Sequence, residues 1–194
     1  MLRDLVLSTA PAAELVTLAE VKGHLRLEGI GDFDAALQGH LDAAIAHLDG
    51  YAGILGRALA TQTWTLYLDA FPASNGPIRL PLPPLISVTS VKHLDTAGVE
   101  QTLVANTDYQ VLAGERAEIR PAYDTSWPSP RCTPRAVTVV FVAGFTQASS
   151  VWPAKLQPVR TALKFMVEEA FRGPDEKRQA AIANLLKPLT IPRL

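Results

Sequence analysis

The hydrophobic pattern changes its period twice along the chain, and this change constrains the fold most. Apolar residues follow helical steps of three and four from residue 18 to 55 and again after residue 153. Residues 61–145 instead alternate, are rich in β-forming residues and are interrupted by prolines, which indicates short strands. Because neither helical end can hide its apolar face alone, the sequence predicts an α+β fold with a four-helix core and an inserted antiparallel β subdomain.

The predicted organisation divides the 194 residues into four parts. Residues 1–60 supply the N-terminal helices of the helical core, 61–150 the inserted β subdomain and 151–187 the C-terminal helices. Residues 188–194 form an apolar tail with two prolines, which we expect to be extended and to find nothing local to pack on.

Several element boundaries carry their own signals. Thr17 and Glu20 have the spacing of a capping box, which predicts a helix start. A second helix is expected from Asp32 or Asp34 to about Leu55, where glycines weaken it. The third helix has a proline suited to its first turn, Pro153, and the fourth opens at 174 or 175 and closes at 188.

The β segment is read from alternation and turn residues. Residues 1–16 are expected to be extended or irregular, residues 97–98 to form a hairpin turn and residues 123–134 to form a loop. Strands are expected at 61–69, 78–80, 88–94, 101–104, 109–112, 117–120 and 136–142. The last of these is the most apolar strand, so we expect it to be central.

Charge is balanced overall but divided along the chain. The formal net charge is −1, yet residues 1–60 hold four Lys/Arg against eight Asp/Glu, and residues 153–194 hold eight against four. This division fits either ordinary solvated charge or a head-to-tail assembly in which opposite ends meet. Four basic residues of the third helix also allow two interpretations. They form either a solvated face or contacts to an acidic partner or to DNA: Lys155, Arg160, Lys164 and Arg172.

No catalytic, metal or cofactor motif is evident, so we expect a non-enzymatic protein without a cofactor. Cys132 is the single cysteine, and His40 and His47 lack a third ligand. A small hydrolase using His93 and Asp95 remains an alternative. So does a ligand-binding module that presents a tryptophan of the β subdomain, although packing explains Trp64, Trp127 and Trp152 more simply.

The N-terminus has an acidic residue and only a short apolar run, so a signal peptide is not expected. No stretch approaches the ~20 apolar residues that a membrane span needs. We therefore expect a soluble protein that is made and used without export, with no membrane partner.

Taken together, the segments resemble the head–tail connector, or head-completion adaptor, family of long-tailed phages and gene transfer agents. Order and spacing carry this resemblance, and no single motif is diagnostic. The matching segments are 18–26 (LAEVKGHLR), the helix end at 51–59, 61–64 (TQTW), 78–81 (IRLP), 88–91 (VTSV), Tyr109, 127–128 (WP), 137–139 (VTV), 143–145 (AGF) and 185–188 (LLKP).

The resemblance implies a structural protein of the virion or phage-like particle at the head–tail junction. Members form a ring, commonly of roughly twelve copies, between the portal protein and a tail-side stopper or terminator protein, with a channel for transient, non-specific DNA contact. By the same resemblance the C-terminal helix and tail dock on the portal, here through Ile182, Leu185, Leu186, Pro188, Leu189, Ile191, Pro192, Arg193 and Leu194. We also expect deletion of residues 188–194 to leave the fold intact and the free protein to be monomeric.

Overall fold

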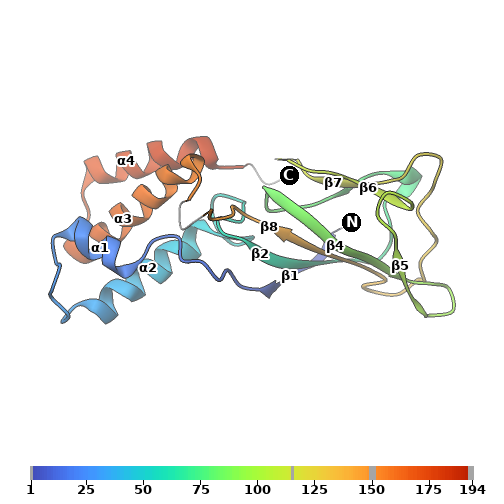
Figure 1. Cartoon of the computed structure of the whole chain (residues 1–194), viewed down its shortest axis with the longest axis horizontal. Coiled ribbons are helices and arrows are strands. Elements are labelled where there is room, and N and C mark those ends of the chain that lie inside the picture. The colour runs from blue at the N-terminus through green and yellow to red at the C-terminus, as the bar shows by residue number, and fades with distance from the viewer. Residues whose placement is uncertain (1, 115, 149–151, 192–194) are drawn as a thin grey trace. The chain divides into compact units, whose positions relative to one another are not determined.

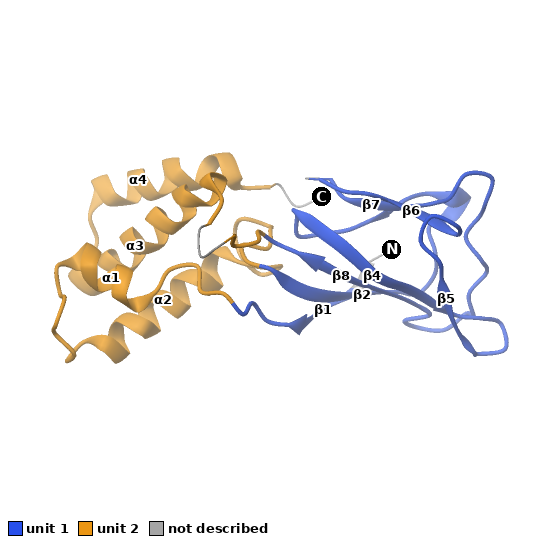
Figure 2. Cartoon of the chain, viewed as in Figure 1, with its two compact units in different colours: residues 1–12, 61–144 blue, residues 13–60, 145–194 orange. Residues whose placement is uncertain are grey.

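Strands and helices separate into two units in the computed structural model, which describes residues 2–114, 116–148 and 152–191. One unit comprises residues 1–12 and 61–144, and the other comprises residues 13–60 and 145–194 (Figure 2). The first contains both sheets and the second contains all four α-helices, so the predicted α+β class is confirmed.

The β unit holds two antiparallel sheets. The larger has the strand order β1-β2-β8-β4-β5 and the smaller the order β3-β7-β6 (Figure 1). Their strands are β1 (Leu2–Thr9), β2 (Gln62–Leu68), β3 (Ile78–Arg79), β4 (Leu85–Leu94), β5 (Glu100–Leu103), β6 (Tyr109–Leu112), β7 (Glu118–Pro121) and β8 (Val137–Ala143).

β8 is the middle strand of the larger sheet, as its apolar sequence predicts. It pairs with β2 on one side and β4 on the other, and Val137, Val139 and Phe141 are fully buried on its inner face. The predicted hairpin turn at 97–98 joins β4 to β5, and the loop predicted at 123–134 follows β7.

The N-terminal residues differ from expectation. Residues 1–16 are expected to be extended or irregular, and Leu2–Thr9 forms the strand β1; residues 1–60 are predicted to belong with the helices, but residues 1–12 group with the sheets. β1 pairs antiparallel with β2 from Leu2↔Leu68 to Thr9↔Thr63. Its strand character depends on this partner about sixty residues away, because its own sequence does not alternate clearly.

The helical unit contains α1 (Leu18–Leu25), α2 (Asp34–Leu48), α3 (Gln157–Arg172) and α4 (Glu176–Leu186). Short 3₁₀ turns at Ala154–Leu156 and Lys187–Leu189 precede α3 and follow α4. Its core is formed by the apolar faces of all four helices, with fully buried leucines such as Leu37, Leu48 and Leu163.

Two of the expected helix boundaries are wrong. α2 ends at Leu48 instead of about Leu55, because Asp49 is extended and its carboxylate accepts a hydrogen bond from the Leu59 N–H at 2.7 Å. Pro153 precedes a 3₁₀ turn, and α3 begins only at Gln157. The capping box at Thr17 and Glu20 is confirmed, and Asp175 caps α4. Within the described residues no helix is long and apolar enough to cross a membrane.

Candidate interaction site

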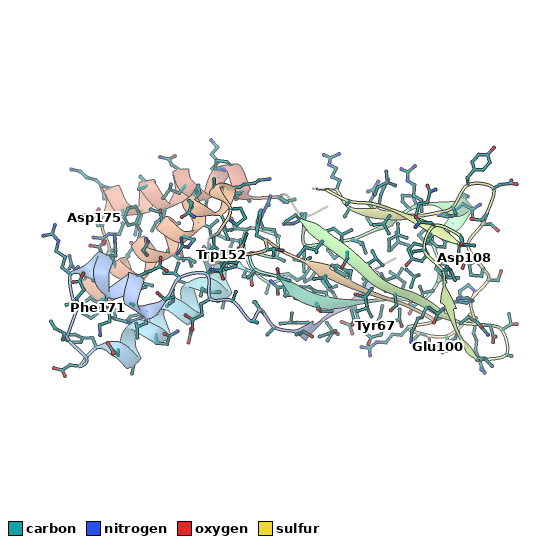
Figure 3. All side chains as sticks on the ribbon, viewed as in Figure 1. Tyr67, Glu100, Asp108, Trp152, Phe171 and Asp175 are labelled. Atoms are coloured by element: carbon teal, nitrogen blue, oxygen red, sulfur yellow. The ribbon has the colours of Figure 1, made fainter. Side chains whose placement is uncertain are left out.

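The C-terminal end of the helical unit is the candidate docking region. Asp175 caps α4 by accepting a hydrogen bond from the Arg178 N–H at 2.8 Å (Figure 3). From there α4 turns Ile182 and Leu185 partly inward against the core, and Leu186 is buried. The core-facing side of α4 is therefore occupied inside this unit.

Residues 187–191 follow α4, and we call this segment the strap. Its Leu189 side chain is only 4% exposed and belongs to the helical core. The Leu189 carbonyl accepts a hydrogen bond from Arg57 Nε at 2.8 Å, and the Ile191 N–H donates to the Leu55 carbonyl at 3.0 Å. The expectation of an extended tail is therefore wrong for residues 188–189, which lie in a 3₁₀ turn, and the segment on which residues 189–191 pack is distant in the sequence.

Gly56 makes the close approach of the strap feasible. Its φ of +65° favours glycine, and a Cβ at this position would lie 3.0 Å from the Ile191 carbonyl oxygen. The strap therefore packs on the loop of residues 55–57, which binds it through the Leu55 carbonyl and the buried Arg57 side chain. Sequence reasoning missed this loop, since a single buried arginine 132 residues from its acceptor gives no local signal.

The structure thus divides the nine predicted docking residues. Leu186 and Leu189 are buried in the core, Ile182, Leu185 and Ile191 are partly buried, and Pro188 is exposed. Pro192, Arg193 and Leu194 lie outside the described residues. Surface available to a partner in this region is therefore provided by Pro188 and the outer side of α4.

The four basic residues of the third helix do not share one role. Arg160 donates to the Leu15 carbonyl at 2.8 Å and pairs with Glu20 of α1. Arg172 donates to the Leu25 carbonyl at 2.9 Å and pairs with Glu168. Both guanidinium groups therefore hold the α1 region onto α3, whereas Lys155 is exposed and Lys164 half-buried.

The contacts of Glu20 with Thr17 and Arg160 change the pKa of its carboxyl. Burial raises the pKa of its carboxyl, but the Thr17 N–H and the Arg160 guanidinium outweigh this effect and hold the pKa below its ordinary value. The ionised carboxylate is thus the form that the folded helical unit favours.

A second charged cluster joins three helices and was not predicted. The Glu168 carboxylate lies 2.9 Å from His24 Nε2 of α1 and 3.2 Å from Arg178 of α4. Arg172, one turn further along α3, contributes at 3.3 Å. Arg172 has the i,i+4 spacing to Glu168 within one helix, whereas His24 and Arg178 come beside Glu168 only when the helices pack.

The two residues of the hydrolase alternative have structural roles. His93 is buried, and its ring packs edge-on against Phe71 at a centroid distance of 5.7 Å. Burial lowers its pKa, although the charge of Asp95 acts in the opposite direction. The Asp95 carboxylate accepts from the Ala97 and Val99 N–H groups at 2.9 Å each and so shapes the hairpin turn.

The tryptophans also serve packing. Trp127 stacks on Phe71 with centroids 4.8 Å apart, and its indole N–H donates to the Gly76 carbonyl at 2.9 Å. Trp152 in the helical unit donates to the Glu14 carbonyl at 3.3 Å (Figure 3). Among the described residues, no three His, Cys, Asp or Glu side chains are placed to hold a metal ion.

Comparisons with solved structures find the same fold over the whole chain. A chain in the virion of a native gene transfer agent particle matches with a TM-score of 0.75 and 26% identity, covering 98% of this chain and 96% of that one. A chain in the neck of an empty gene transfer agent particle, computed with C6 symmetry, matches with a TM-score of 0.77 and 25% identity. The match covers 99% of this chain and 97% of that one. The predicted resemblance is confirmed.

A third chain, in the neck of a native gene transfer agent particle computed with C12 symmetry, has a TM-score of 0.74. At 24% identity, with 99% of this chain and 97% of that chain covered, it supports the fold alone. No protein-family model and no curated protein sequence matches this chain.

Proposed function

We propose that this chain is a head–tail connector adaptor of a gene transfer agent or a related phage-like particle. In this proposal about twelve copies form a ring under the portal, join the capsid to tail components and leave a channel for DNA. The four helices form the core of each copy, with the β unit inserted between them. The observation that carries the proposal is the full-length similarity to gene transfer agent chains at 25% and 26% identity.

The similar chains are components of the particle, and one belongs to its neck. A location at the head–tail junction follows from that similarity, and we propose that the chain is made in the bacterial cytoplasm. The C6 symmetry of the neck fits a subunit number that is a multiple of six. A closed ring needs many modest contacts, since each one reinforces the next when the ring closes.

Docking on the portal is assigned to the chain end and to the exposed part of the strap. Because residues 189–191 are held by Leu55 and Arg57, they fix where the chain leaves the helical unit. Pro192, Arg193 and Leu194, together with Pro188, would then reach the portal from a fixed base, which lowers the entropy cost of binding. A tail-side stopper or terminator protein would bind the opposite side of the ring.

DNA contact in the channel is proposed to be transient and non-specific. A formal net charge of −1 does not favour tight binding to a polyanion. Lys155, Arg160, Lys164 and Arg172 remain the candidates for this contact, although Arg160 and Arg172 also donate hydrogen bonds to the Leu15 and Leu25 carbonyls inside the helical unit.

A truncation series tests the docking assignment. Deleting residues 192–194 should leave the free energy of unfolding unchanged and remove binding to the purified portal in a pull-down. Deleting residues 189–194 should in addition destabilise the helical unit, because Leu189 leaves the core and Arg57 loses an acceptor. Normal portal binding after the shorter deletion would contradict the assignment.

Deleting the whole gene tests the function itself. The expected product is heads that lack tails and fail to retain DNA, restored by the wild-type chain supplied in trans. Complete, DNA-filled particles without this polypeptide, checked by electron microscopy and immunoblotting, would overturn the proposal.

A further inference from the structure

The helical unit has two different outer helices. α3 packs against α2 on one side and against α4 on the other, so it lies between them (Figure 2). The outward faces of α2 and α4 are therefore separate surfaces of the same unit. A ring of identical copies with head-to-tail contacts needs two such non-identical surfaces on every copy.

The outward face of α2 is acidic and flat. Helical spacing places Ala35, Gly39, Asp42, Ala43 and Ala46 opposite the buried leucines, and all five are exposed. The face is flat because all of these residues except Asp42 have small side chains that do not project. The acidic character of the face comes from Asp42, because Asp34 pairs with Lys22 at 2.6 Å and Asp49, after the end of α2, accepts from the Leu59 N–H. The sequence holds no lysine or arginine between Arg26 and Arg57.

Gly39 is a second observation on this face. A Cβ built on Gly39 would have nothing within 4 Å, so no contact inside the chain requires glycine here. Glycine in an exposed helix interior destabilises the helix relative to alanine. A surface that must approach another backbone closely gives a reason for keeping it.

The outward face of α4 is basic. Glu176, Lys177, Ala180, Ala183 and Asn184 are exposed on it, and Lys187 continues the same side into the strap, so two lysines face one glutamate there. Glu176 is the one acidic residue between positions 176 and 191. Neither lysine forms an ion pair with another described side chain, in contrast to Arg178, which is held by Glu168. These two charges are therefore available to a partner.

We propose that the acidic face of α2 in one copy binds the basic face of α4 in the next copy, and that this contact closes the ring. The inference rests on the proposed function for the ring itself and adds the surfaces that build it. Opposite charges steer the two faces together and set their order around the ring, while like faces repel each other. The alanines and Gly39 let the helices approach closely.

Disulfide trapping tests the contact. In a Cys132→Ser background, Gly39→Cys combined with Ala180→Cys should, on oxidation of isolated particles, give a ladder of multimers in denaturing electrophoresis. A head-to-tail contact predicts no dimer from either single cysteine variant. The matched control pairs Gly39→Cys with Thr102→Cys, an exposed position on β5, and should stay monomeric.

Immunoblotting of the same particles separates this inference from the proposed function. Particles that contain the chain but give no ladder, or that give dimers from Gly39→Cys alone, would overturn the contact. Absence of the chain from complete particles would instead overturn the function.

Charge reversal provides a test that does not depend on the exact pairing of residues. Asp42→Lys, and separately Lys177→Glu with Lys187→Glu, should each lower ring yield about tenfold at low salt, as counted by electron microscopy. Combining all three changes should restore most of the yield, because the attraction is then reversed in sign. Failure of the combination to restore rings, with each variant folded by circular dichroism, would also contradict the proposal.

Discussion

Different kinds of contact stabilise the inside of each unit. In the β unit, regular backbone pairing and an alternating buried face connect neighbouring strands, as along β2 and β8. In the helical unit, arginines reach carbonyl groups far away in the sequence, as Arg57 does to Leu189 and Arg160 to Leu15. Both units have an apolar core, but the helical unit adds single arginine side chains that bind carbonyl groups far away in the sequence.

The largest effect is expected at the centre of the β unit. Phe141→Ala removes a fully buried ring from the middle strand and should lower the free energy of unfolding by about 3–5 kcal/mol. Val142→Ala, on the other face of β8 and only half-buried, is the matched control and should cost much less. Urea unfolding followed by tryptophan fluorescence measures both, and equal losses would contradict a one-sided core.

Arg57 tests the helical unit. Arg57→Met should destabilise it by about 1.5–3 kcal/mol, because the buried Leu189 carbonyl loses a charged donor. Methionine keeps most of the side-chain volume, so the effect reports the hydrogen bond more than packing. Arg26→Met, at an exposed arginine in the same unit, should change stability little. Hydrogen exchange of the Ile191 amide should rise in Arg57→Met alone.

Mild acid should affect the β unit first. The pKa of His93 is lowered by burial, so the unfolded chain binds a proton more readily than the folded one. The stability that neutral His93 contributes is present above its unfolded pKa of about 6.5 and is lost as the pH falls toward the folded pKa. His93→Phe should flatten the dependence of unfolding free energy on pH below about 6.5. An unchanged slope would show that His93 does not set it.

The smallest effect is expected for the helical unit in stronger acid. The pKa of Glu20 is lowered in the folded state, so its contribution is present above the unfolded pKa of about 4.3 and is lost as the pH falls through the folded value. Glu20→Gln should weaken this dependence slightly, since the side chain is partly exposed and water screens the Arg160 pair. Urea unfolding at a series of pH values measures this dependence for the wild-type chain and for Glu20→Gln, and identical slopes would contradict the role of Glu20.

Much of the fold is readable from local signals. The capping box fixes the start of α1, the turn at 97–98 joins β4 to β5, and apolar alternation identifies β8 as the central strand. The resemblance to connector adaptors was also available from the order of short segments. These features succeed because the residues that specify them are close in the chain or repeat along one element.

The docking region shows where local signals stop. Its apolar residues led to the prediction of a docking segment, but the sequence does not tell which of them are buried in the helical core. Leu189 and Ile191 read as a free tail until the loop at 55–57 is placed beside them.

The sequence by itself determined the α+β class, the central strand, most helix starts and the division of charge between the two ends of the chain. Only the tertiary structure decided that residues 2–9 form a strand, that α2 ends at Leu48 and that the strap is held by Leu55 and Arg57. The physical reason is distance along the chain. β1 and the strap are stabilised by hydrogen-bond partners about sixty and more than a hundred residues away, so their energy exists only after distant segments have come together. The end of α2 depends on the nearer hydrogen bond between Asp49 and Leu59, which forms only when the loop after the helix folds back.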